Sequence, residues 1–183
     1  KVFKIKEDVD LVTISGKLKG YRQEEEFSHA DEKVTLITEI GDLVLGSDYL
    51  EGTFFQDIPF TVKHRGGERL VIKTIEAPFL FQVEGERMLL VILEKKRTAN
   101  NIANQLSKIL FISTGSIVEA KILPETLRRF HEANPEDTKV IFFDGVDIPN
   151  VDKLSLYGSQ LADTALYNEY LTHGTIWYIV FKS

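Results

Sequence analysis

Residues 98–111 read TANNIANQLSKILF, and this stretch decides how the chain is divided. Its apolar residues recur at helical spacing and form one stripe, made of Ala99, Ile102, Ala103, Leu106, Ile109 and Leu110. The period-two alternation that dominates residues 1–93 stops here, which predicts a change from strands to helices. We expect an amphipathic helix over 98–111, with the Thr98 hydroxyl as its N-cap.

Residues 1–93 have the pattern of a β-rich region, because apolar residues alternate with polar ones and glycines separate the runs. The expected strands cover residues 2–6, 9–18, 34–40, 43–45, 58–64, 69–75, 78–83 and 87–93. Residues 19–33 concentrate charge without periodicity, which indicates an exposed loop. Because Gly adopts positive φ at little steric cost, we expect tight turns at Gly41-Asp42, Arg65-Gly66-Gly67 and Glu84-Gly85.

Helices and strands alternate in the rest of the chain. The expected strands cover residues 116–122, 140–143, 153–157 and 175–182, and the expected helices cover 124–133 and 161–171, with Ser159 as a candidate N-cap. This β-α-β-β-α-β order resembles the ferredoxin-like split motif. The order over residues 9–111, about seven strands and then one helix, resembles the pleckstrin-homology-like superfold, in which a helix closes one end of a strongly bent sheet or barrel.

The expected fold class is therefore α+β. We divide the chain into a β-rich domain over residues 1–112, which ends in the amphipathic helix, and a ferredoxin-like α/β subdomain over 113–183. Residues 111–115 at the join read FISTG and are too apolar for a flexible linker. We therefore expect the two parts to pack together.

Composition excludes several classes of chemistry. The chain has 22 Lys and Arg against 28 Asp and Glu, a formal net charge of −6, which disfavours indiscriminate polyanion binding. Since it has no cysteine, thiolate zinc sites, iron–sulfur clusters, disulfides and cysteine nucleophiles are excluded. No membrane-spanning run or secretory signal is visible, so we expect a cytoplasmic protein. The scarcity of thermolabile residues favours a heat-adapted source.

One candidate ligand site is basic. Lys95, Lys96 and Arg97 precede the helix at 98–111, where cations oppose the helix dipole unless an anion is bound. The same helix carries Asn101, Asn104 and Lys108, which could donate to phosphates or read base edges. The competing interpretation is an ordinary solvated helix face.

A second candidate site is acidic. Asp144, Asp147 and Asp152 follow the apolar strand expected at 140–143, and carboxylates at a strand's C-terminal end can hold Mg²⁺ or act as general acid and base. The competing interpretation is turn chemistry, in which these side chains bond their own backbone. Their spacing does not match an EF-hand loop.

Other chemistry-bearing residues favour structural roles. His131 extends the basic region formed with Arg128 and Arg129, and His173 suits a helix C-terminus. The aromatic residues of the last strand, Trp177, Tyr178 and Phe181, are expected in the core, because clustered apolar residues are usually buried. Phosphate-binding glycine loops and nucleophile elbows are missing from the sequence.

The sequence therefore predicts a non-enzymatic binding or regulatory module without a cofactor, acting through a protein partner or an anionic ligand. Two alternatives stay open: a metal-dependent hydrolase or nuclease at Asp144, Asp147 and Asp152, and a nucleic-acid-binding protein that uses the helix between Lys95 and Lys108. Homo-oligomerisation is a further expectation if the final apolar strand lies at a sheet edge.

Overall fold

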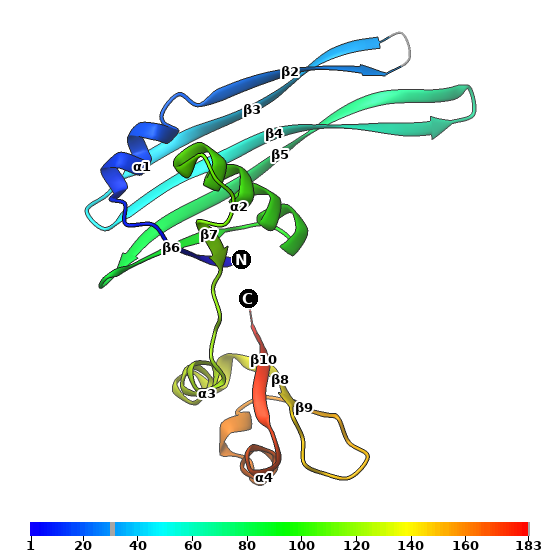
Figure 1. The fold of residues 1–183 in the computed structure, drawn as a ribbon. Helices are drawn as coiled ribbons and strands as arrows, with labels where there is room; N and C mark the ends of the chain where they lie inside the picture. Colours follow the sequence, from blue (N-terminus) through cyan, green and yellow to red (C-terminus); the bar gives the residue numbers. More distant parts are fainter. Residues whose placement is uncertain (30–31, 183) are drawn as a thin grey trace. The chain divides into compact units, whose positions relative to one another are not determined.

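The computed structural model describes residues 1–29 and 32–182 and divides into two compact units, Lys1–Ala120 and Lys121–Ser183 (Figure 1). Both units combine helices with antiparallel sheet, which confirms the expected α+β class. The division falls after Ala120 and not after residue 112, because the strand at Ile117–Glu119 pairs with the N-terminal strand of the first unit. The expected packing of the two parts against each other stays a prediction.

The first unit is built on one antiparallel sheet of seven strands in the order β2-β3-β4-β5-β6-β1-β7. Its strands are β1 (Val2–Ile5), β2 (Arg22–His29), β3 (Glu32–Leu45), β4 (Tyr49–His64), β5 (Gly67–Glu84), β6 (Arg87–Ile92) and β7 (Ile117–Glu119). Its helices, α1 (Leu11–Leu18) and α2 (Lys96–Phe111), share one hydrophobic core with the sheet (Figure 1).

The sheet is open, which corrects the expected barrel. Its edge strands are β2 and β7, and they do not pair with each other. The amphipathic helix α2 lies across one face of the sheet and does not close the end of a barrel (Figure 1). Among the described residues of this unit, both helices lie on that same face, and the opposite face carries none (Figure 1).

The expected strand at 9–18 is wrong, because most of this segment forms α1. The Asp10 carboxylate caps the helix by accepting from the Thr13 backbone N–H at 2.6 Å. Leu11, Ile14 and Leu18 recur at helical spacing and are all buried. Apolar and polar residues also alternate locally in this segment, as they do in a strand. Burial of the stripe at helical spacing favours the helix over the strand.

The expected loop at 19–33 is also wrong for residues 22–29, because they form β2 and pair with β3 over their whole length, whereas residues 30–31 of that range lie outside the described residues. The eight side chains of β2 alternate between the two faces of the sheet without building an apolar stripe, and only Phe27 is half-buried while the other seven are exposed. Backbone hydrogen bonds to β3, and not side-chain burial, therefore hold β2 in place.

Two expected breaks lie inside continuous strands. Gly41-Asp42 is a bulge within β3, where the register shifts between Gly41 and Val44 and Asp42 adopts φ 55°. Residues 76–77 continue β5, so the strands expected at 69–75 and 78–83 are one. The turns at Gly66-Gly67 and Gly85 are hairpin turns as expected.

The stripe of residues 98–111 forms α2, as predicted, and supplies much of the core. Ala99, Ile102, Ala103, Leu106 and Leu110 are at most 2% exposed. The helix starts earlier than expected, since Lys95 and not Thr98 occupies the N-cap position, with no side-chain cap. Its last residue is followed by Ile112 in the left-handed conformation.

The second unit contains five main elements: α3 (Pro124–Ala133), β8 (Thr138–Asp144), β9 (Lys153–Tyr157), α4 (Ala165–His173) and β10 (Thr175–Phe181). Short 3₁₀ turns cover Pro135–Asp137 and Leu161–Asp163, and Thr164, not Ser159, caps α4. The sheet has three antiparallel strands in the order β10-β8-β9. The ferredoxin-like motif is therefore not formed, because its expected first strand, β7, belongs to the other sheet.

Among the described residues, no helix is both long and apolar enough to cross a membrane.

Two glycines test this packing. An alanine Cβ at Gly52 would lie 2.7 Å from Phe79 Cζ and 2.8 Å from Leu43 Cδ2, so Gly52→Ala should lower the free energy of unfolding by about 1–3 kcal/mol. In α1, Gly16 has nothing within 4 Å of such a Cβ, so Gly16→Ala should raise it by about 0.5–1 kcal/mol. Urea unfolding measures the change in the free energy of unfolding for each variant. Equal changes in the two variants would contradict the close packing at Gly52 and the open space at Gly16.

Candidate functional site

The basic candidate forms one stripe on the solvent side of α2. Arg97, Asn101, Asn104 and Lys108 are exposed and follow one another at helical spacing, opposite the buried stripe. Lys95 and Lys96 are also exposed at the helix start. The structure therefore brings the predicted residues to one face, although no side chain there is buried.

Solvation accounts for this face without a ligand. Among the described residues, Lys95, Arg97 and Lys108 take part in no ion pair. The Lys95 backbone N–H bonds the Glu94 carboxylate at 2.7 Å, which places a negative charge beside the helix start. An anionic ligand at this face stays a prediction.

The acidic candidate is not gathered into a metal site. The Asp144 carboxylate accepts from the Gly145 N–H at 3.0 Å and lies 3.8 Å from Lys153 Nζ, while Asp147 bonds His173 Nδ1 at 2.7 Å. Across residues 1–29 and 32–182, no group of three or more His, Asp or Glu side chains could hold one metal ion. The metal-binding hypothesis for Asp144, Asp147 and Asp152 stays a prediction without support from this arrangement.

His131 lies in the core of the second unit and not in a basic surface patch, which corrects its expected position. Its Nδ1 lies 2.8 Å from Thr138 Oγ1, and its ring packs edge-on against Tyr167 with centroids 5.0 Å apart. Its Nε2 has no hydrogen-bond partner among the described groups. Burial lowers the pKa of His131, and the Glu132 carboxylate offsets part of this effect.

A polar cluster borders this histidine. The Tyr167 hydroxyl donates to Glu132 Oε1 at 3.2 Å, and the same oxygen lies 2.8 Å from Arg128 Nε. Arg128 lowers the pKa of Glu132, and burial raises the pKa of Tyr167. The cluster ties α3 to α4, which is a structural role.

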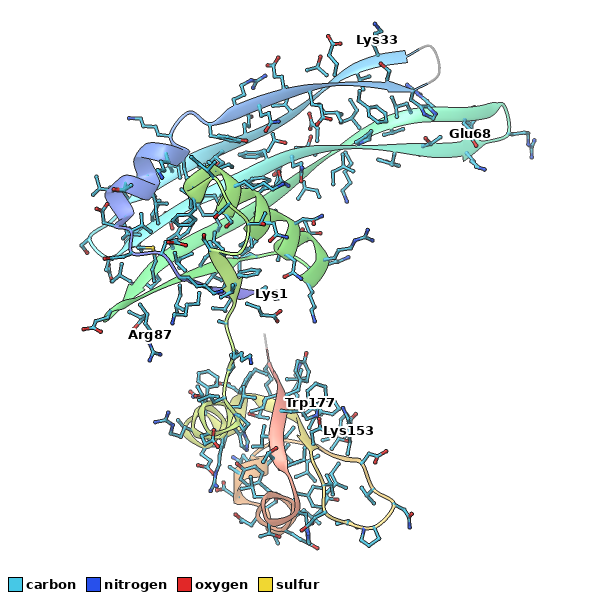
Figure 2. All side chains as sticks on the ribbon, viewed as in Figure 1. Lys1, Lys33, Glu68, Arg87, Lys153 and Trp177 are labelled. Carbon is cyan, nitrogen blue, oxygen red and sulfur yellow. The ribbon has the colours of Figure 1, made fainter. Side chains whose placement is uncertain are left out.

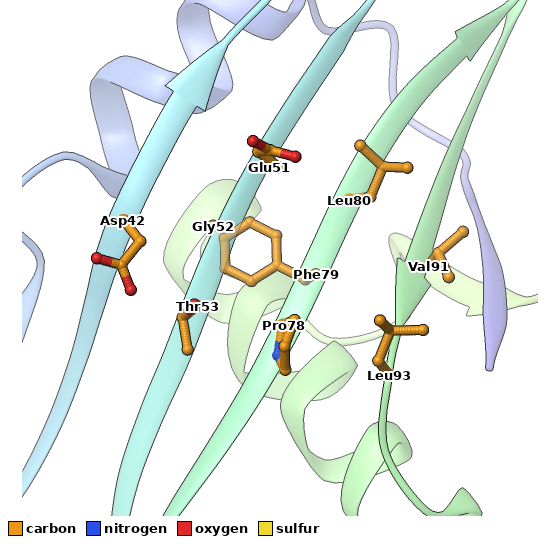
Figure 3. Close-up of a pocket in the computed structure, with 9 residues that line it drawn as sticks. All are labelled: Asp42, Glu51, Gly52, Thr53, Pro78, Phe79, Leu80, Val91 and Leu93. Atoms are coloured by element: carbon orange, nitrogen blue, oxygen red, sulfur yellow. The ribbon is translucent and has the colours of Figure 1, made fainter.

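A hollow of about 390 Å³ lies on the helix-free face of the large sheet (Figure 3). Its walls are mostly apolar, and Asp42 and Glu51 supply its carboxylates. The bulge in β3 places Asp42 at the rim. The hollow could take an apolar side chain, and the full lining is Asp42, Glu51, Gly52, Thr53, Pro78, Phe79, Leu80, Val91 and Leu93.

The most distinctive surface lies on the sheet of the second unit. Four aromatic side chains gather on its outer side, opposite the core formed with α3 and α4; we call them the aromatic face, and they are Phe142, Tyr157, Trp177 and Tyr178. The Phe142 ring is central, with centroids 6.3 Å from Tyr157, 6.3 Å from Trp177 and 5.6 Å from Tyr178. Tyr157 is 71% exposed, Tyr178 51% and Trp177 46%.

A β-bulge creates this face. Ile176 pairs with Phe143 and Tyr178 pairs with Phe142, so Trp177 is an extra residue in β10. Without the bulge, Trp177 and Tyr178 would point to opposite faces of the sheet. With it, both rings lie outside, 5.8 Å apart.

The expected burial of Trp177 and Tyr178 is therefore wrong, whereas Phe181 is partly buried against Phe130. The sequence does contain a weak signal, since two large adjacent aromatics cannot both enter one core from a regular strand.

One cation borders the aromatic face. Lys153 Nζ lies 4.3 Å from the centre of the Trp177 ring, and Figure 2 shows these two side chains together. A cation over an exposed ring contributes about 0.5–1 kcal/mol, so Lys153 restrains the indole. Asp144 Oδ2 lies 3.8 Å from the same amine, so a carboxylate partly offsets the charge at this edge of the face.

Comparisons with protein-family models, with curated proteins and with solved structures found no match for this chain.

The buried histidine predicts a pH dependence of stability. Because its folded-state pKa is below the unfolded value of about 6.5, neutral His131 contributes stability above that pH, and this contribution falls as pH falls through the window below it. The urea midpoint should be lower at about pH 5.5 than at about pH 7.5 in the native chain, and His131→Gln should reduce this difference.

His29→Gln is the matched control, because His29 is exposed in β2. It should leave the pH difference unchanged. An unaltered difference in His131→Gln would contradict the assignment.

Proposed function

We propose that the protein is a non-enzymatic protein-binding module, and that its aromatic face receives an uncharged apolar peptide segment of a partner protein. The observation that carries the proposal is the exposure of three large aromatic side chains around Phe142 on one sheet face. Aromatic side chains supply much of the binding energy at protein interfaces, since they bury a large area at a small cost in side-chain entropy.

The chemistry of the face supports peptide recognition. Tyr157 and Tyr178 each combine an apolar ring with a hydroxyl, so they can pack against side chains and bond the partner's backbone. Val140 pairs with Tyr157 on β9 and with Val180 on β10, which extends the face with aliphatic surface. An extended proline-rich segment fits such a surface, because its conformation is set before binding.

The charges around the face disfavour nucleic acid as the ligand. Stacking platforms for single strands are combined with several cations that follow the phosphate backbone. Here the second unit has six basic and nine acidic residues by sequence, 6 − 9 = −3. Lys153, which borders the face, already contacts Trp177 and Asp144.

The hydrolase alternative has less support, since Asp144 and Asp147 contact Lys153 and His173 and not one another.

Selection from a random-peptide library tests the proposal on the full chain. Peptides should be enriched on the native protein and lost on Trp177→Ala/Tyr178→Ala, with a rise in Kd of at least about tenfold for each selected peptide. They should be apolar and without excess charge. Peptides that bind both proteins equally would overturn the proposal.

Leu166→Ala is the control, because Leu166 is 51% exposed on α4, away from the aromatic face. It should bind the selected peptides as the native chain does.

Fluorescence supplies an independent readout, since Trp177 is the only tryptophan in the chain. Selected peptides should shift its emission to shorter wavelength. Oligothymidylate should leave the emission unchanged at low salt; quenching that disappears with added salt would identify a nucleic-acid site instead.

A further inference from the structure

The large sheet forks at Asp57. Pairing between β3 and β4 ends at Thr38 and Gln56, although each strand continues beyond that point with its other neighbour. The Asp57 carboxylate accepts from the Ile37 N–H at 3.1 Å and from the Thr74 hydroxyl at 2.7 Å. It therefore satisfies a backbone donor at the point where the two strands separate.

Beyond the fork, the sheet continues as two separate two-stranded ribbons (Figure 1). The first consists of residues 22–29 and 32–37 and the second of residues 58–73; Figure 2 labels Lys33 on the first and Glu68 on the second. A two-stranded ribbon in water is marginally stable by itself, because it has no second layer. A second layer packed against either ribbon would therefore increase the stability of that ribbon.

The two ribbons have opposite charge. By sequence, residues 58–73 hold four basic side chains and one acidic one, 4 − 1 = +3, and we call them the basic arm. By sequence, residues 22–29 and 32–37 hold two basic and four acidic side chains, 2 − 4 = −2, and we call them the acidic arm.

The basic arm exposes apolar side chains on both faces. Ile58, Phe60 and Val62 are 38–43% exposed and alternate along β4, so they share one face, and Ile72 on the other face is 39% exposed. Lys73 pairs with Ile58 and Arg69 with Val62, so two cations flank this apolar row.

The acidic arm presents a matching row. Phe27 pairs with Val34, and Glu25 pairs with Leu36, so three half-buried apolar side chains share a face with a carboxylate. The Gln56 side chain faces α2, because Gln105 Nε2 of that helix donates to it at 3.1 Å. Thr38 pairs with Gln56 and therefore shares its face. Leu36 lies two residues from Thr38, so it is on the same side of the sheet. The apolar rows of both arms therefore lie on the α2 side, beyond the part of the sheet that α2 covers.

Among the described residues, no ion pair joins one arm to the other. The ion pairs recorded on the described residues of the arms join Arg22 to Glu24 and Glu39, and Lys63 to Glu68, each within its own ribbon or at its base. Glu25, Arg69 and Lys73 take part in none of these pairs. A second copy, related by a two-fold axis, offers each arm a partner of opposite charge and makes every contact twice.

We propose that two copies of this chain form a dimer in which the basic arm of each lies against the acidic arm of the other. Apolar rows cover each other in this arrangement, and Arg69 and Lys73 of one copy face Glu25 of its partner. The inference concerns the first unit and does not depend on the peptide-binding function proposed for the aromatic face.

Charge reversal tests the proposal. The native chain should be a dimer by light scattering and sedimentation equilibrium at about 50 mM salt, with weaker association at about 500 mM. Arg69→Glu/Lys73→Glu and Glu25→Lys should each raise the dimer dissociation constant by at least about tenfold, because each brings like charges together twice. Circular dichroism checks that both variants fold, and the substituted residues are all exposed.

Mixing supplies the decisive readout. An equimolar mixture of the two variants should form a heterodimer. In one contact the reversed basic arm meets the reversed acidic arm, and in the other the two unchanged arms meet, so opposite charges face each other in both. Lys95→Glu/Arg97→Glu is the matched control, with the same change in net charge outside the arms, and it should stay dimeric.

Three results would overturn the proposal: a native chain that is monomeric at high micromolar concentration, reversed variants that remain dimers, or a mixture that stays monomeric. If the native chain is a monomer and binds oligothymidylate through Arg69 and Lys73, the basic arm is a polyanion site instead.

Discussion

The apolar stripe of α2 is the contact on which the first unit depends. Ile102, Leu106 and Leu110 are almost fully buried and belong to the same core cluster as Phe54 and Phe81 of the sheet. Burying a side chain of this size contributes about 1.5–3 kcal/mol, so this one helix supplies a large share of the hydrophobic stabilisation. An antiparallel sheet can leave its other face to solvent, which is how this sheet remains open.

The length of α2 also sets where the core ends. The strands β4 and β5 pair without a break from Tyr49–Gln82 to His64–Gly67, which is much further than the sixteen residues of one helix can cover. The strands therefore extend beyond the part of the sheet that α2 covers. Where backbone pairing between β3 and β4 stops, the Asp57 carboxylate accepts hydrogen bonds from the Ile37 N–H and the Thr74 hydroxyl. The exposed apolar residues of the arms follow from this mismatch between strand length and helix length.

Local irregularities in otherwise regular strands determine which side chains face outward. The bulge at Asp42 places a carboxylate at the rim of the hollow on the helix-free face, and the bulge at Trp177 turns a second aromatic ring onto the surface of the small sheet. Each inserts one residue and changes the facing of a side chain without ending the strand. In a strand of unbroken period two, Trp177 and Tyr178 would lie on opposite faces of the small sheet.

By itself, the sequence determined the α+β class, the position of α2 and α3, and the hairpin turns at Gly66-Gly67 and Gly85, because these follow from local periodicity, Pro at a helix start and glycine conformations. It also placed the basic residues of α2 on one helix face, since helical spacing is local.

Only the tertiary structure decided that residues 22–29 form a strand, that β7 joins the first unit and that Trp177 lies outside. Each of these depends on which strand pairs with the segment and in which register, and strands that are far apart in the sequence meet only in the folded chain. The same holds for the buried His131, whose surroundings come from α4 and β8.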